Sequence, residues 1–158
     1  MSLKHAAQTA LTTLGHFSAG AQTISATSGD LKLSIDLVAL ETLGCAMTRF
    51  ELTTPRLASA TTEELEQIAA NVAGRVTYLL EAISPIEVDQ EHCVVQMRSH
   101  PPQKTDDGTT YYELLVRRGG GLSLVRYQKQ PGDQRQPIAA QVTREVLLRL
   151  VDDFAAVV

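Results

Sequence analysis

TYYELLVRRGGGLSLVRYQKQ, residues Thr110 to Gln130, places three consecutive glycines between two segments rich in apolar residues. Glycine tolerates positive φ without a steric penalty, so a glycine run between two periodic segments supplies the backbone freedom that a tight turn needs. The stretch therefore predicts a β-hairpin, and the arginines on both sides of its turn indicate where a partner could bind.

Two registers of this hairpin are compatible with the sequence. A two-residue loop of Gly119 and Gly120 gives favourable cross-strand pairs, which are Glu113 with Arg126, Tyr112 with Tyr127, and Leu115 with Leu124. A three-residue loop slips the register by one residue and moves every later side chain to the opposite face. It groups on one face the residues Tyr112, Leu114, Val116, Leu122 and Leu124. Either register leaves apolar groups on both faces, which predicts that the second face is also covered, by a helix or by another chain.

The remaining periodicity predicts three helices and two further pairs of strands. Thr61 and Glu64 match a capping box at the start of the clearest helix, whose apolar residues form one continuous stripe up to Ile83. Ser2 can cap a helix at the start of the chain. The expected elements are helices over 2–17, 61–83 and 142–156, strands over 31–37 and 45–52, and a second hairpin of 86–88 with 93–99.

Two segments lack a clear period. Residues 18–29 are rich in Ser, Ala, Thr and Gly, so we expect a connection with some extended structure around Ile24. Residues 100–108, HPPQKTDDG, are expected to form a polar loop.

The resulting order is α, ββ, α, ββ, ββ, α. Strands joined by short hairpins are antiparallel, and helices that do not alternate with single strands favour the α+β class. The sequence therefore predicts a single α+β domain over 1–158, with an antiparallel sheet of about five to six strands and three helices. Alternation within 45–52 is expected to put Phe50 and Leu52 on one side of the sheet and Cys45 and Met47 on the other.

Length and composition are those of one globular domain. The chain has 158 residues and a mass of 17.1 kDa, of which 44% are hydrophobic and 20% charged, so it needs no disulfide or metal to fold. Met1-Ser2-Leu3 could be partly a cloning remnant. No apolar run reaches the roughly 20 residues needed to cross a bilayer, and no signal peptide is recognisable, so the expected location is the cytoplasm.

Cysteines and charge add two expectations. Cys45 and Cys93 lie far apart in strand-like segments, and a reducing cytosol favours two buried thiols over a disulfide. Residues 1–91 hold 5 Lys/Arg and 11 Asp/Glu, a balance of −6, whereas residues 92–151 hold 9 and 5, a balance of +4. Such an asymmetry can favour self-association or an anionic partner.

No chemical motif emerges from the sequence. The four histidines, which are His5, His16, His92 and His100, have no metal-ligand spacing, and alternation along a strand points the neighbours His92 and Cys93 to opposite faces. The glycine run is followed by neither Lys-Ser/Thr nor a helix, so it is no phosphate-binding loop. We identify no catalytic, cofactor-binding or metal-ligating residue, expect no cofactor, and favour a protein that is not an enzyme.

The leading hypothesis is a non-catalytic protein-interaction or chaperone/adaptor-like module that acts as a homodimer. Excess apolar surface without accompanying chemistry suggests that the hairpin face or the broad apolar arc of the last helix forms the interface. The candidate interface residues are Leu115, Arg117, Leu122, Leu124, Arg126, Leu148, Val151 and Ala155. In architecture alone, a small acidic α+β chain with helices at both ends resembles secretion-chaperone-like domains.

Three alternatives stay open. The first is a small-ligand domain with an apolar pocket between helix 61–83 and the sheet, gated by the loop 100–108. The second is a weak nucleic-acid binder that uses basic and aromatic residues of the hairpin region, namely Arg98, Arg117, Arg118, Arg126 and Lys129 with Tyr111, Tyr112 and Tyr127. The third is an enzyme of a class without a short motif, whose polar residues converge only in space.

Overall fold

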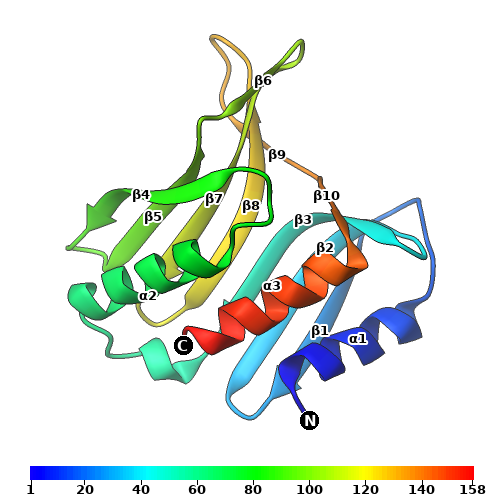
Figure 1. The fold of residues 1–158 in the computed structure, drawn as a ribbon, viewed down its shortest axis with the longest axis horizontal. Coiled ribbons are helices and arrows are strands. Elements are labelled where there is room, and N and C mark those ends of the chain that lie inside the picture. Colours follow the sequence, from blue (N-terminus) through cyan, green and yellow to red (C-terminus); the bar gives the residue numbers. More distant parts are fainter.

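Ten strands form one antiparallel sheet, and three helices lie side by side on one of its faces (Figure 1). The computed structural model describes residues 1–158. Along the sheet the main strands follow the order β1-β2-β3-β8-β7-β5-β4, while the short strands β10, β6 and β9 pair with β3, β7 and β8. The predicted α+β class and the order of its elements are confirmed, and the sheet is wider than the five to six strands expected.

The bounds of the elements are as follows. The helices are α1 (Leu3–Leu14), α2 (Thr62–Arg75) and α3 (Arg144–Ala156), with a 3₁₀ turn at Pro55–Leu57. The strands are β1 (Gln22–Ser28), β2 (Leu31–Leu40), β3 (Gly44–Thr53), β4 (Ala82–Asp89), β5 (Val94–His100), β6 (Gln103–Thr105), β7 (Gly108–Arg117), β8 (Gly121–Lys129), β9 (Gln136–Ile138) and β10 (Ala140–Thr143).

The glycine-turn hairpin is β7–β8, and its loop has three residues, from Arg118 to Gly120. Leu114 pairs with Leu124, so the three-residue register is confirmed and the two-residue register is wrong. Gly119 adopts a φ of +71°, which side chains rarely tolerate. The next β8 residue, Gly121, approaches the β3 backbone so closely that a Cβ there would lie 1.8 Å from the Leu52 carbonyl oxygen.

One row of directly paired residues forms the centre of the core. It crosses six strands and consists of Ile24, Ile35, Phe50, Leu124, Leu114 and Met97, each at most 4% exposed. The helices cover this row, and the Phe154 ring of α3 meets the Phe50 ring edge-on at a centroid distance of 4.9 Å. The adjacent row faces the other way and is mostly polar: Ser25, Ser34, Glu51, Ser123, Leu115 and Gln96. The sheet therefore has one helix-covered face and one helix-free face, because side chains alternate along each strand.

The helix caps agree with the sequence. The side chains of Ser2 and Thr61 accept hydrogen bonds from the backbone N–H groups of His5 and Glu64, at 3.1 and 3.2 Å. Thr143 caps α3 in the same way, so that helix begins at Arg144, two residues later than expected. Each cap satisfies a backbone donor that the first helical turn leaves unpaired.

Two strand segments differ from the prediction. Residues 22–28, expected to be mainly a connection, form β1 and pair with β2. Only two side chains of this strand, Ile24 and Ala26, are buried, so its apolar alternation is weak. In β3 the register shifts beside Thr48, so that Asp36 pairs with Arg49 but Leu37 pairs with Met47. This bulge moves Met47 and Cys45 to the core side, which corrects the simple alternation expected there.

The helix expected over 61–83 is also shorter than predicted. α2 ends at Arg75, one residue after Gly74, whose helical propensity is low. Beyond it, Leu79 is buried and Ile83 belongs to β4, so the apolar stripe persists in residues that are not helical. The expected polar loop over 100–108 contains the short strand β6, which pairs with the start of β7.

None of the three helices is long and apolar enough to cross a membrane.

Candidate interaction surfaces

The candidate interface residues of the hairpin and the last helix occupy three different environments. Leu122, Leu124 and Val151 are buried in the core of the single chain, so they offer no surface to a partner. Leu148 and Ala155 are half-buried and pack against the same core, since α3 contacts α1, α2 and the sheet. Leu115 and Arg117 lie on the helix-free face, and Arg126 lies on the helix-covered face, in register with Tyr112. The structure therefore does not bring these eight residues together into one surface.

Arg126 belongs to a buried polar network. Its guanidinium donates to the Glu81 carboxylate at 2.9 Å and to the Thr110 hydroxyl at 2.9 Å, and the Arg126 and Glu81 side chains are only 13% and 4% exposed. The Ser99 hydroxyl donates to the other Glu81 oxygen at 2.7 Å and accepts from the Tyr112 backbone N–H at 2.8 Å. Glu81 directly precedes β4, so the network ties the start of that strand to β5, β7 and β8.

Arginine–glutamate contacts partly cover the helix-free face. Glu51 of β3 accepts from Arg49 and from Arg117, the latter at 3.1 Å. This arrangement corrects the expectation that a helix covers the second face of the hairpin, whereas cover by another chain stays a prediction. Leu115 and Val125 lie half-buried among these polar groups.

A second carboxylate, Glu113 of β7, is buried on the same face. It accepts from Gln96 at 2.8 Å and from two nitrogens of Arg135. This pairing raises the pKa of the Arg135 guanidinium above its usual range, although desolvation acts in the opposite direction. Arg135 is therefore fixed as a cation, and it lies over the Tyr127 ring at 4.0 Å.

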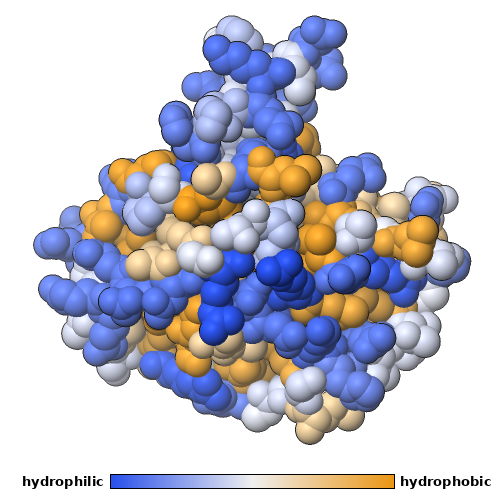
Figure 2. All heavy atoms as spheres, in the orientation of Figure 1, coloured by the Kyte–Doolittle hydropathy of each residue, from blue (hydrophilic) through white to orange (hydrophobic).

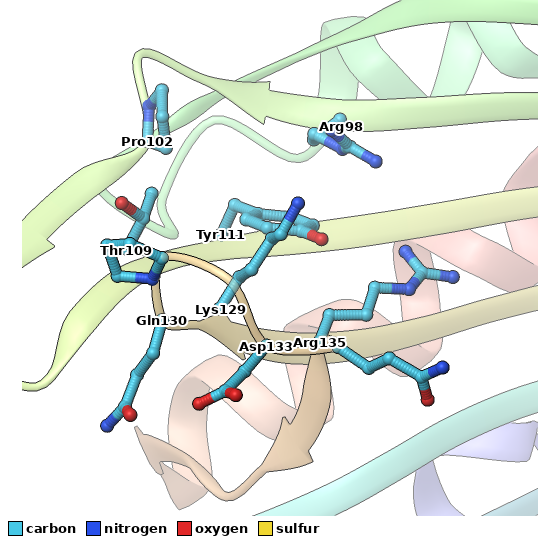
Figure 3. Close-up of a pocket in the computed structure, with 10 residues that line it drawn as sticks. Arg98, Pro102, Thr109, Tyr111, Lys129, Gln130, Asp133 and Arg135 are labelled. Atoms are coloured by element: carbon cyan, nitrogen blue, oxygen red, sulfur yellow. The ribbon is translucent and has the colours of Figure 1, made fainter.

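A cavity of about 840 Å³ opens beside this pair (Figure 3). It is lined by residues from β5, from the ends of β7 and β8, and from two connecting loops, which are Arg98, Pro102, Thr109, Tyr111, Lys129, Gln130, Pro131, Asp133, Gln134 and Arg135. The Arg98 guanidinium lies 4.4 Å from the Tyr111 ring centroid, and the Tyr111 and Tyr127 rings are 6.0 Å apart. The cavity thus has an aromatic residue in its wall and three cationic side chains around it.

The nucleic-acid alternative is only partly compatible with this arrangement. Arg98 and Lys129 line the same cavity, as that hypothesis requires. Arg126, however, is on the opposite face, and Arg118 in the hairpin loop donates to the Ala60 carbonyl. Tyr111 is buried and has a guanidinium over its ring, so it offers no free face on which a base could stack.

The layer between α2 and the sheet is filled. On α2 the inward residues Leu65, Ala69 and Val72 are fully buried, as are Val95 and Met97 on β5 beneath them. The cavity of Figure 3 is instead on the helix-free face, and its wall includes Pro102 from the proposed gating loop and Thr109, the residue that follows this loop. This packing counts against an apolar ligand pocket at the predicted place.

The free edge of β4 forms a different kind of surface. β4 is the last strand of the main path and pairs only with β5. Leu80, Ile86 and Val88 are 90%, 50% and 37% exposed, and they account for three of the five large apolar side chains exposed on the chain. We call these three residues the β4 patch; Figure 2 shows apolar residues at the surface along β4. This patch was not predicted, because Leu80 falls in the apolar stripe of the helix expected over 61–83.

The cysteines are free thiols, and both are buried, as expected. Burial raises the pKa of the Cys45 thiol to about 11, so it is protonated at neutral pH. The His92 backbone N–H donates to Asp89 at 3.0 Å, and the His92 ring contacts the same carboxylate at 2.9 Å on the surface. These two contacts lower the Asp89 pKa. No group of three or more His, Cys, Asp or Glu side chains is arranged to hold a metal ion.

Comparison with family models, with curated proteins and with solved structures found no match for this chain.

Proposed function

We propose that the chain is a non-catalytic protein-interaction module that forms a homodimer through the β4 patch. The observation that carries this proposal is the concentration of exposed Leu80, Ile86 and Val88 within nine residues at a free sheet edge. Apolar side chains exposed at a free sheet edge are typical of interaction sites on soluble domains.

The opposite edge of the sheet provides an internal comparison. β1 is also unpaired on its outer side, and its exposed residues are the polar Gln22, Thr23, Ser25 and Thr27. Natural sheets use polar side chains to protect their free edges, whereas β4 exposes the apolar Ile86 and Val88 beside its polar Ser84 and Glu87.

Leu80 supports the proposal through its backbone. It is a leucine in the left-handed region, with a φ of +65°, and its side chain is almost fully exposed. Such a conformation costs about 1–3 kcal/mol and is typically kept at sites where the local geometry has a role. Here it projects an apolar side chain outward, beside the start of β4.

The proposed contact is made by side chains rather than by a continuous strand ladder. Pro85 lacks a backbone N–H, and the β4 register shifts between Pro85 and Glu87, so a partner strand could not pair regularly along this edge. A second copy related by a two-fold axis would bring the same apolar residues against each other, which is the usual form of a homodimer contact. Glu87 beside the patch would face its own copy, so added salt should strengthen the dimer.

A lysine at Ile86 is expected to disrupt this dimer. The charge enters both halves of a symmetric contact, so we expect the dissociation constant of Ile86→Lys to rise by about 30-fold or more, equivalent to about 2 kcal/mol. The measurement is sedimentation velocity over a range of protein concentrations.

Leu43→Lys is the matched control for this experiment. Leu43 is also an exposed leucine, in the β2–β3 turn and outside the patch, so its substitution should leave the dissociation constant unchanged. If Ile86→Lys self-associates as strongly as Leu43→Lys, the β4 patch is not the interface.

A chaperone or adaptor role is the finer form of the same proposal. In such a dimer the helix-free faces of both sheets would stay available to a second protein, with arginine and glutamate side chains on their surface. The charged character of this face supports recognition of a partner by polar contacts.

A further inference from the structure

Two cationic side chains at the cavity of Figure 3 have no hydrogen-bond partner in the protein. Lys129 makes neither a hydrogen bond nor an ion pair. Arg98 stacks over the Tyr111 ring, and its one ionic contact is long, 4.0 Å from the Glu113 carboxylate. The Nε atom of Arg98 is buried and unpaired, as is the Nε atom of Arg117. A buried donor without a partner is unfavourable, and native proteins rarely keep one without a reason.

Three other arginines around this sheet each place a terminal guanidinium nitrogen on a carboxylate. Arg117 donates to Glu51, Arg126 to Glu81 and Arg135 to Glu113. Arg98 lies next to Glu113, but Arg135 and Gln96 already occupy that carboxylate. Arg98 therefore keeps donors that are free to bind another acceptor.

The charges around the cavity favour a single negative charge. Arg98, Lys129 and Arg135 contribute three positive charges, while Glu113 below and Asp133 at the rim contribute two negative ones. Figure 3 shows the cationic ends on the Tyr111 side, with the Asp133 carboxylate turned away from them. A monoanion would neutralise the remaining charge, whereas a dianion such as sulfate would reverse it.

We propose that this cavity binds a carboxylate group. The planar carboxylate accepts two parallel hydrogen bonds from one guanidinium, so it matches the free donors of Arg98, and Lys129 adds a flexible second cation. Glu113 acts as a positioning residue, because it holds Arg135 at the cavity wall. Pro102 and Pro131 supply apolar contacts for the rest of the ligand.

The test uses benzoate as the probe and side-chain NMR as the readout. Benzoate should shift the Arg98 Nε–H resonance saturably, with a dissociation constant on the order of millimolar. Benzamide, which has the same ring without the charge, and sulfate at equal ionic strength should produce no saturable shift. Saturable binding of either one at this resonance would overturn the carboxylate assignment, as would the absence of any response to benzoate.

Variants separate the site from general charge effects. We expect Arg98→Gln and Lys129→Gln to weaken benzoate binding, the first by about tenfold or more, read on the Thr109 and Tyr111 amides. Arg149→Gln is the matched control, since Arg149 also lies over a tyrosine ring, Tyr78 at 4.1 Å, with a carboxylate at 4.0 Å, but outside the cavity. An equal loss in Arg149→Gln, or no loss in either cavity variant, would contradict the proposal.

A comparison of peptides with benzoate identifies the source of the carboxylate. A blocked tripeptide with a central Asp is compared with its Asn counterpart and with benzoate, in the same wild-type protein. Tighter binding of the Asp peptide than of benzoate points to an acidic protein segment, and the reverse order to a free organic acid. Equal binding of the Asp and Asn peptides, with benzoate inactive, would overturn the proposal.

Discussion

Arg126→Met is expected to lower the free energy of unfolding by about 3 kcal/mol or more, the usual loss when one partner of a buried ion pair is removed. Methionine keeps much of the apolar length of arginine but leaves the Glu81 carboxylate, 4% exposed, without its cation. The substitution also removes the hydrogen bond to Thr110 and the guanidinium that lies 4.5 Å from the Tyr112 ring centroid. Urea unfolding followed by circular dichroism measures the change.

A second substitution shows whether the uncompensated charge is the cause. Glu81→Gln in the Arg126→Met background removes that charge and keeps a side chain that can accept from Ser99. We expect the double variant to regain about half of the lost stability or more, because the largest part of the loss is the burial of an unpaired carboxylate. Additive losses would mean that the two residues contribute independently to the free energy of unfolding and that the broken ion pair is not the main cause of the loss.

Gly121→Ala is expected to be the most damaging change in the glycine turn, with a loss of about 3 kcal/mol. Its Cβ would lie 1.8 Å from the Leu52 carbonyl oxygen and 2.9 Å from the Leu52 carbonyl carbon, so β3 and β8 would have to separate locally. Backbone atoms of a central strand pair cannot rotate away as a side chain could. The change in urea midpoint, at constant denaturant slope, measures the loss.

Gly119→Ala provides the comparison with Gly121→Ala within the same three glycines. Its φ of +71° strains an alanine, but no atom lies within 4 Å of the added Cβ, so we expect a loss of only about 1 kcal/mol. If the two variants lose equal stability, the close approach of β8 to β3 is not the constraint at Gly121.

The fold class could be read from the sequence because its strongest patterns are local. Thr61 caps a helix, Leu31 to Leu37 alternate, and the glycine run makes a hairpin turn, all without reference to the rest of the chain. The register of that hairpin could not be chosen, because Gly121 is required by its contact with β3 rather than by the turn itself. A contact between strands about 70 residues apart leaves no periodic signal in either one.

The same reason explains the bulge in β3 and the length of α2. An apolar stripe with helical spacing runs from Leu65 to Ile83, yet Leu79 and Ile83 reach the core from a loop and a strand. Helical periodicity predicts which residues are buried better than it predicts the backbone that buries them. Since Leu80 was assigned to this helix, the β4 patch could not be foreseen.

The cavity on the helix-free face was visible only in part. Arg98, Lys129 and Tyr111 stand out as basic and aromatic residues near the hairpin, but their grouping suggested nucleic acid. Arg135 lies in a turn-rich segment without periodicity, although it fixes one wall of the cavity by binding Glu113. The absence of hydrogen bonds donated by the Arg98 guanidinium is a property of the folded chain, and no sequence pattern predicts it.

The native mass of the unmodified protein tests the central claim most directly. Sedimentation equilibrium at micromolar concentration should give twice the 17.1 kDa of the chain, with the dimer fraction increasing when salt is added. A single species of 17.1 kDa over the whole concentration range, with or without salt, would contradict a homodimer formed through the β4 patch.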